Sequence, residues 1–286
     1  MSDGNGHPYS WSAILNGYDP EAMASCPFPA IPAYLAERQF PRDRLDGARV
    51  THVWTQDRAV SAHIARASLI DQIVSDPVEM LGHVDGILLA RDDAQSHRAL
   101  AAPFLAAGLP VYVDKPLATT VAETHALLEL ARDPAQIFSC SALRYAPELS
   151  LGSELRDRIG AVEEIEARSP KEWATYAVHA IEPVISWLPD AEVEVTEGSR
   201  DGPATSVRAT IGRVRARFMT TGTSDGEIEI EVRGASGSAR LVFEDSFTAF
   251  KSALAAFLMQ ARTGIEQIPR RQTLAIVSLI EAGTRA

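Results

Sequence analysis

A lysine that follows a short apolar segment is the residue best placed to do chemistry. Val111-Tyr112-Val113 is predicted to be a strand, and Asp114, Lys115 and Pro116 come directly after it. Ligands of open parallel sheets bind beyond the carboxyl ends of the strands, so Lys115 is expected where a cofactor and a substrate would meet. A lysine partly removed from water exchanges a proton with a substrate hydroxyl more readily. From position alone, a surface lysine that ends a strand is an equally good interpretation.

A histidine in an apolar helix is the second candidate. The segment 173–182 is predicted to be helical, and Thr175, His179 and Glu182 fall on one face of it at steps of four and three. An imidazole, which titrates near neutral pH, suits proton transfer from a carbinol. A histidine in such a helix is more often a satisfied core residue, but its pairing with the lysine motif favours a catalytic role.

A short glycine turn near the start is the candidate dinucleotide site. Gly4, Gly6 and His7 precede a predicted helix, as in a turn that holds a pyrophosphate, although Tyr9 stands at the third glycine position. Only three residues come before the turn, too few for the central strand of a Rossmann sheet. Without that strand, its two neighbours would keep unpaired backbone groups. Three explanations stay open: the sequence starts late, another segment or partner fills the gap, or dinucleotide binding has been lost.

The end of the next predicted strand bears on the choice between NAD and NADP. The segment reads Val53-Trp54-Thr55-Gln56-Asp57, and Trp54 is a candidate cofactor contact. Asp57 is placed either to accept from an adenosine ribose hydroxyl, which favours NAD, or to cap the following helix. Arg58 suits a 2′-phosphate equally well, so both cofactors remain candidates.

The predicted elements indicate two domains. Strands alternate with helices over residues 1–146, which predicts a parallel α/β sheet of the Rossmann type whose first strand is apparently missing. Over residues 147–286 several strands alternate apolar and polar residues, which predicts an α+β domain with a mostly antiparallel, open sheet. A Pro-rich stretch over residues 19–41 is expected to exclude regular helix until after Pro32 and either to cover the active site or to be a plain surface loop.

Composition and charge exclude several classes of protein. The formal net charge of −11 argues against a nucleic-acid partner. No apolar run is long enough to cross a membrane, and the first residues do not resemble a secretory signal. Cys26 and Cys140 lie in no metal-ligand spacing, so neither a metal site nor a disulfide is expected, and a cytoplasmic location fits. Lysine is rare, since Lys115, Lys171 and Lys251 are the only three.

Asp85 to Ala118 resembles the Gfo/Idh/MocA oxidoreductases, the glucose–fructose oxidoreductase and inositol dehydrogenase type. Their hallmark is a Glu-Lys-Pro turn, for which this chain has Asp114-Lys115-Pro116. His97 is similar to a histidine of that family, whereas Arg91-Asp92 replaces its usual Thr-Pro. Downstream, the segments 143–147 and 159–162 and the C-terminal helices are similar as well.

The resemblance implies an NAD- or NADP-dependent dehydrogenase or reductase that acts on a sugar, cyclitol or related polyol and is a homo-oligomer through its second sheet. His179 maps onto the family's histidine, but Thr175 stands where the family has an aspartate, with Tyr176 beside it. The implied roles are these: Lys115, His179, Tyr176 and Asp114 catalytic; Gly4, Gly6, His7, Trp54, Asp57, Arg91, His97 and Lys115 at the cofactor; Arg144, Trp173 and Glu182 at the substrate.

Two other functions remain possible from the sequence. A non-redox enzyme on the same fold, such as a lyase or a glycoside-cleaving relative, is favoured by the missing strand, Thr175 and Arg91-Asp92. A non-catalytic scaffold derived from the fold is disfavoured by the presence of both Lys115 and His179.

Overall fold

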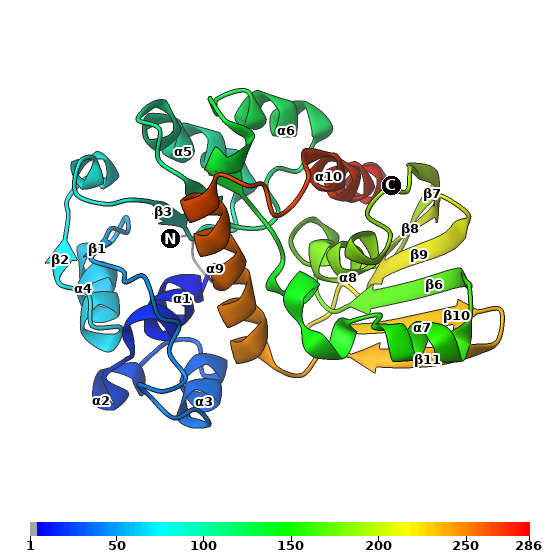
Figure 1. Ribbon diagram of the computed structural model, residues 1–286, viewed down its shortest axis with the longest axis horizontal. Coiled ribbons are helices and arrows are strands. Elements are labelled where there is room, and N and C mark those ends of the chain that lie inside the picture. The colour runs from blue at the N-terminus through cyan, green and yellow to red at the C-terminus, as the bar shows by residue number, and fades with distance from the viewer. Residues whose placement is uncertain (1–4) are drawn as a thin grey trace. The chain divides into compact units, whose positions relative to one another are not determined.

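The computed structural model describes residues 5–286, which divide into two compact units that interleave along the chain (Figure 1). Unit 1 comprises residues 1–114, 128–138 and 250–267, and unit 2 comprises residues 115–127, 139–249 and 268–286. The chain therefore passes between the units several times and not once near residue 146. Packing explains why residues 250–267 return to unit 1. Phe257 lies against Tyr112 and Phe138, with ring centroids 5.6 and 5.9 Å away.

Unit 1 contains parallel strands in two separate pieces. β1 (His52–Val53) pairs with β2 (Gln72–Ile73), and β4 (Val111–Val113) lies between β3 (Ile87–Leu89) and β5 (Ile137–Phe138). β4 is buried at every residue, as expected for a strand covered on both faces. β2 has too little apolar pattern to be recognised in the sequence.

The helices of unit 1 follow the predicted alternation. They are α1 (His7–Asn16), α2 (Pro20–Met23), α3 (Ala30–Ala36), α4 (Arg58–Ala67), α5 (His97–Ala106) and most of α9 (Ser246–Thr263), with 3₁₀ turns at Pro77–Met80, Ala94–Ser96 and Pro134–Gln136. The expectation of no helix before Pro32 is wrong. Pro20 and Pro32 both lie in the first turn of a helix, where no intrahelical partner for the N–H is required.

Unit 2 is built on a mixed sheet with the strand order β11-β10-β6-β9-β8-β7. Its strands are β6 (Val162–Ser169), β7 (Val193–Asp201), β8 (Ala204–Ile211), β9 (Val214–Thr220), β10 (Glu229–Gly234) and β11 (Gly237–Val242). Only the β6–β9 pair among these neighbours is parallel. The helices are α6 (Val121–Leu128), α7 (Ser153–Ile159), α8 (Trp173–Trp187) and α10 (Arg270–Arg285), with 3₁₀ turns at Ala142–Tyr145 and Pro147–Leu149.

One face of this sheet is apolar and the other is charged. Ile165, Ala216 and Phe218 are buried on the face where α8 packs across β6 and β9 (Figure 1). On the opposite face Arg215 and Arg233 form ion pairs with Glu164. The predicted fold class, a Rossmann-like parallel domain followed by a mostly antiparallel α+β domain, is confirmed. No helix in residues 5–286 is both long and apolar enough to traverse a bilayer.

Candidate active site

Two lysines of unit 2 flank one tyrosine. Lys115, which is joined to Pro116 by a cis peptide bond, is only 7% exposed, and its Nζ lies 5.7 Å from the centroid of the Tyr176 ring. Lys171 Nζ lies 4.2 Å from the same centroid and donates a hydrogen bond to the Tyr176 hydroxyl. An ammonium group over an aromatic face is attracted by the ring quadrupole. Tyr176 therefore has two lysine side chains near its ring, and the hydrogen bond from Lys171 favours a fixed position of its hydroxyl.

His179 lies one helical turn from Tyr176 on α8. The two rings meet edge to face, with centroids 5.1 Å apart. Nδ1 of His179 lies 2.8 Å from Oγ of Ser141, and the backbone N–H of Ser141 donates to Oε2 of Glu182 over 2.7 Å. Ser141 therefore couples the two α8 side chains that the helical spacing had placed on one face, and it fixes the orientation of the imidazole ring.

Glu182 is a buried acid beside this cluster. Burial raises its pKa from the ordinary 4.5 to about 7, against the opposing effect of Arg144, whose Nη1 lies 3.4 Å from Oε1. Arg144 is also hydrogen-bonded to Gln272 of α10. Lys115 and Glu182 both line a cavity of about 10 Å³, which is close to the space that one water molecule requires. Arg144 and Glu182 thus lie beside the catalytic candidates, and their predicted role at the substrate stays a prediction.

Lys171 was not predicted as a site residue. Its backbone adopts φ = 62°, which is uncommon for a residue other than glycine, and two hydrogen bonds hold it there: its N–H donates to Thr223 O over 2.6 Å, and Gly222 N–H donates to its carbonyl over 2.9 Å. Strained residues of this kind cluster at functional sites. The rarity of lysine was a usable signal, since Lys171 is one of three.

Trp173 lies in the core and not at the cluster. It is 4% exposed, its indole N–H donates to Ile280 O of α10, and its ring packs where a Cβ on Gly283 would fall, 2.2 Å from Cε2. The absence of a side chain at residue 283 is what allows this helix–helix approach. Trp173 therefore connects α8 to α10.

Asp114 belongs to unit 1 and contacts the glycine turn. Its carboxylate is fully buried, and Oδ2 accepts from Asn5 Nδ2 and contacts His7 Nδ1, each over 2.7 Å. The ring of His7 stacks on Trp11, with centroids 4.7 Å apart. The turn that leads into α1 is therefore hydrogen-bonded to the end of β4 through Asp114. This contact joins residues more than a hundred positions apart in the chain.

The glycine turn itself is closed by side chains of the Pro-rich stretch. A Cβ on Gly6 would lie 2.7 Å from Ile31 and 3.0 Å from Phe28, so these side chains already occupy the approach. The His7 N–H donates to Asn5 Oδ1 over 2.8 Å, residue 8 is a proline, and the Tyr9 N–H donates to Gly6 O. A pyrophosphate needs free amides at this point. The described turn does not fit one unless Phe28 and Ile31 withdraw. Gly4 lies outside the described residues.

The other predicted cofactor residues have intramolecular partners. Asp57 caps α4 by accepting from Ala59 N over 2.7 Å, and Trp54 Nε1 donates to Ser75 O. His97 is fully buried, with Nε2 2.8 Å from Arg91 O, and Arg91 in turn binds Asp93 in a two-point ion pair. For Asp57, the capping role that the sequence left open is the one adopted. Residues 5–286 hold no group of three or more His, Cys, Asp or Glu side chains placed to bind a metal ion.

Comparison with known proteins gives a family match over part of the chain and a likeness of fold over most of it. Residues 34–141 match the Gfo/Idh/MocA family, described as an oxidoreductase family with an NAD-binding Rossmann fold. Inositol 2-dehydrogenase 1 of Saccharopolyspora erythraea is 40% identical over 81 residues, which are 27% of this chain and 23% of that protein. The chain thus aligns with less than a quarter of that relative.

Solved structures extend the likeness of fold to most of the chain. The myo-inositol dehydrogenase of Lactobacillus casei, in complex with NAD(H) and myo-inositol, has a TM-score of 0.67 at 16% identity, over 84% of this chain and 87% of that one. The myo-inositol 2-dehydrogenase of Lactobacillus plantarum has a TM-score of 0.68 at 14% identity, over 85% and 90%. These comparisons support the Rossmann fold that the sequence predicted. The matched family is described as NAD-binding, so NAD is the cofactor that this fold holds there.

Proposed function

We propose that this chain, whose residues 34–141 match the Gfo/Idh/MocA oxidoreductases, is a nicotinamide-dependent dehydrogenase or reductase of a sugar, cyclitol or related polyol. The reaction would move hydride between a carbinol carbon and NAD or NADP. The observation that carries the proposal is the cluster of Lys115, Tyr176 and His179, three groups suited to proton transfer within one unit.

Lys115 would hold the substrate oxygen and exchange its proton. The side chain is almost fully buried and comes from the turn after a strand, where ligands of parallel sheets bind. His179 would be the partner acid or base, since Ser141 at Nδ1 sets the direction of the ring. Glu182, which lines the same small cavity as Lys115, would support this proton exchange through one water molecule.

Tyr176 would be the second proton-transfer group, with Lys171 as its positioning residue. Lys171 donates to the phenol oxygen and lies over the ring, so it restricts the hydroxyl to one position. This arrangement provides a polar group next to the residue where the family's aspartate is replaced by Thr175. Asp114 would keep the turn before Lys115 in place through Asn5 and His7.

Binding and turnover measurements test the proposal together. Purified protein should quench or enhance the fluorescence of NADH or NADPH in a saturable way, and a panel headed by myo-inositol should reduce the oxidised cofactor. Saturable binding of one dinucleotide with polyol-dependent reduction supports the function. Binding of neither dinucleotide up to millimolar concentration would contradict it.

A second candidate is a non-redox enzyme on the same fold, such as a lyase. The closed glycine turn favours it, because Phe28 and Ile31 lie where the approach of a pyrophosphate would be. Release of a product from a polyol derivative without added dinucleotide, lost on Lys115→Met, would favour this candidate over the first.

The proposal includes a cytoplasmic location and a homo-oligomeric assembly. Neither Cys26 nor Cys140 forms a disulfide in the described residues, which suits a reducing cytoplasm. The charged face of the unit 2 sheet is the expected homo-oligomer interface. Its charged side chains, such as Arg208 and Arg215, would form ion pairs with a second copy, so association should weaken as the salt concentration rises in sedimentation velocity measurements.

A further inference from the structure

Two of the three lysines of the chain lie beside one tyrosine. Lys115 Nζ and Lys171 Nζ are 5.7 and 4.2 Å from the centroid of the Tyr176 ring. Because both distances end at the same centroid, the two ammonium groups are at most about 10 Å apart, which is about one Debye length at physiological salt. Both charges therefore act on one small ligand. In a chain with a formal net charge of −11, this is a local concentration of positive charge.

Lys171 forms no ion pair within residues 5–286, although Glu172 follows it in the sequence. The residue is exposed, and its Nζ donates to the Tyr176 hydroxyl. An ammonium group has three N–H donors, so two donors remain after the one that the tyrosine takes. The charge and the remaining donors of Lys171 are thus available to a ligand.

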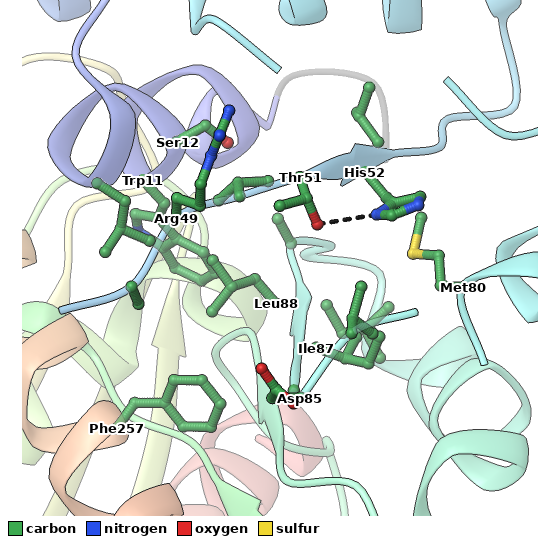
Figure 2. Close-up of a pocket in the computed structure, with 18 of the residues that line it drawn as sticks. Trp11, Ser12, Arg49, Thr51, His52, Met80, Asp85, Ile87, Leu88 and Phe257 are labelled. Atoms are coloured by element: carbon green, nitrogen blue, oxygen red, sulfur yellow. Dashed lines mark hydrogen bonds between the residues drawn. The ribbon is translucent and has the colours of Figure 1, made fainter. Parts of the chain in front are cut away.

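Two arginines at a cavity of unit 1 show the opposite arrangement. Arg49 and Arg91 line this cavity of about 600 Å³, and Figure 2 shows Arg49 beside it. Arg49 pairs with Asp71 over 2.7 Å, and Arg91 pairs with Asp93 over 2.6 Å. Lys171 differs from both arginines because no acid of the described chain neutralises it.

The acid closest to the catalytic candidates does not balance the lysines. Glu182 is the acidic residue among those that line the small cavity with Lys115, and Nη1 of Arg144 lies 3.4 Å from its Oε1. Burial raises the pKa of Glu182 to about 7, so near neutral pH this side chain is protonated for much of the time. Lys115, Lys171, Arg144 and Glu182 together therefore have a net positive charge.

The backbone holds Lys171 in place before any ligand arrives. The segment 169–171 is hydrogen-bonded to the segment 221–223, with Thr221 N–H donating to Ser169 O over 3.1 Å and Lys171 N–H donating to Thr223 O over 2.6 Å. A side chain on a fixed backbone loses less conformational freedom when it binds. Lys171 is in this sense prepared for a contact with a ligand.

We propose that the substrate of this site is a sugar or cyclitol derivative that carries an anionic group, a carboxylate or a phosphate, and that Lys171 binds this group while Lys115 holds the reacting carbinol. The inference rests on the proposed function, because it takes the surroundings of Lys115 and Tyr176 as the reacting site. A lysine ammonium is a compact charge without the planar geometry of a guanidinium, so it suits both kinds of anion. A charge-assisted hydrogen bond is about 2.7–2.9 Å long, so a hexose-sized ligand reaches from one lysine to the other.

Matched pairs of ligands test this inference by calorimetric titration of the full chain, without dinucleotide and with NADH. The pairs are glucose with glucuronate, glucose with glucose 6-phosphate, and galactose with galacturonate. In at least one pair the anionic member should bind more tightly at low salt by about tenfold or more, and added salt should reduce this preference. The pair with the largest preference distinguishes a carboxylate from a phosphate.

The ratio of the two affinities, anionic to neutral, is the measurement that variants should change. Lys171→Met should bring this ratio near one because the charge is lost, whereas Lys171→Arg should keep most of it. Lys251→Met is the matched control, since it removes the same charge from a lysine that donates to Asp43 O, and it should leave the ratio unchanged. A ratio that survives in Lys171→Met, or that falls equally in Lys251→Met, would overturn the inference.

Three further results separate this inference from the proposed function. Binding that is selective for the anionic members, without any reduction of NAD or NADP, supports the anionic ligand and contradicts the dehydrogenase. Turnover of neutral polyols with no preference for the anionic members supports the dehydrogenase and overturns the anionic substrate. Absence of binding by every anionic member up to about 10 mM would overturn it as well.

Discussion

The hydroxyl oxygen of Ser141 lies 2.8 Å from Nδ1 of His179, although 38 residues separate them in the chain. Ser141 also begins the 3₁₀ turn that carries Arg144, and its N–H is bound by Glu182. The direction of the imidazole ring therefore depends on where the chain enters unit 2.

Ser141→Ala should lower kcat about tenfold to a hundredfold with little change in KM, because an unoriented imidazole transfers a proton less efficiently. Steady-state kinetics with the reactive polyol measure this. Ser186→Ala is the control, since the Ser186 hydroxyl lies on α8, the helix of His179, but donates to Pro183 O. Equal losses in the two variants would argue against a positioning role for Ser141.

Lys115→Met should lower kcat by about 10²- to 10⁴-fold, because the variant keeps the aliphatic stem and loses the amine that exchanges the proton. Circular dichroism should show an unchanged fold. Lys251→Met, which removes a hydrogen bond to Asp43 O outside the cluster, should retain most of the activity. Turnover by the Lys115 variant at the original rate would remove the basis of the proposed function.

Lys171→Met should lower kcat about tenfold, and Lys171→Arg should recover part of the loss, because an arginine can still donate to the phenol oxygen. Tyr176→Phe should have a larger effect. The double variant should be no worse than Tyr176→Phe alone, since Lys171 acts through that hydroxyl. Additive losses would mean that the two residues act independently.

Glu182 should make the protein less stable as the pH rises. Burial raises its pKa to about 7 in the folded state, above the ordinary value of 4.5, so the folded state binds the proton more tightly than the unfolded state does. Its contribution to the free energy of unfolding therefore falls between about pH 4.5 and 7, by about 3 kcal/mol at most. Glu182→Gln, which is always neutral, should show a flatter dependence of Tm on pH in this range. Parallel profiles for the two proteins would contradict this reading.

Phe28→Ala should increase the affinity for NADH about threefold to tenfold, because the ring no longer has to leave the glycine turn before a pyrophosphate enters. Fluorescence titration measures the affinity. Phe40→Ala, which removes a ring that packs on Tyr18 in the same Pro-rich stretch, should leave it unchanged. A lower affinity in the Phe28 variant would mean that the ring helps to bind the dinucleotide.

Local sequence determined most of the elements, though not β2, α2 and α3, and the main catalytic candidates. The apolar run before Asp114 predicted β4, and the spacing of four and three predicted that His179 and Glu182 share a face of α8, because strand and helix periods are properties of neighbouring residues. The family resemblance followed from the same local motifs.

Only the tertiary structure decided which distant residues meet. Ser141 at His179, Lys171 at Tyr176 and Phe28 at Gly6 depend on the path of the chain through turns and on backbone hydrogen bonds, which no local period encodes. The interleaving of the two units has the same origin, since the return of residues 250–267 to unit 1 rests on the packing of Phe257 against strands far away in the sequence.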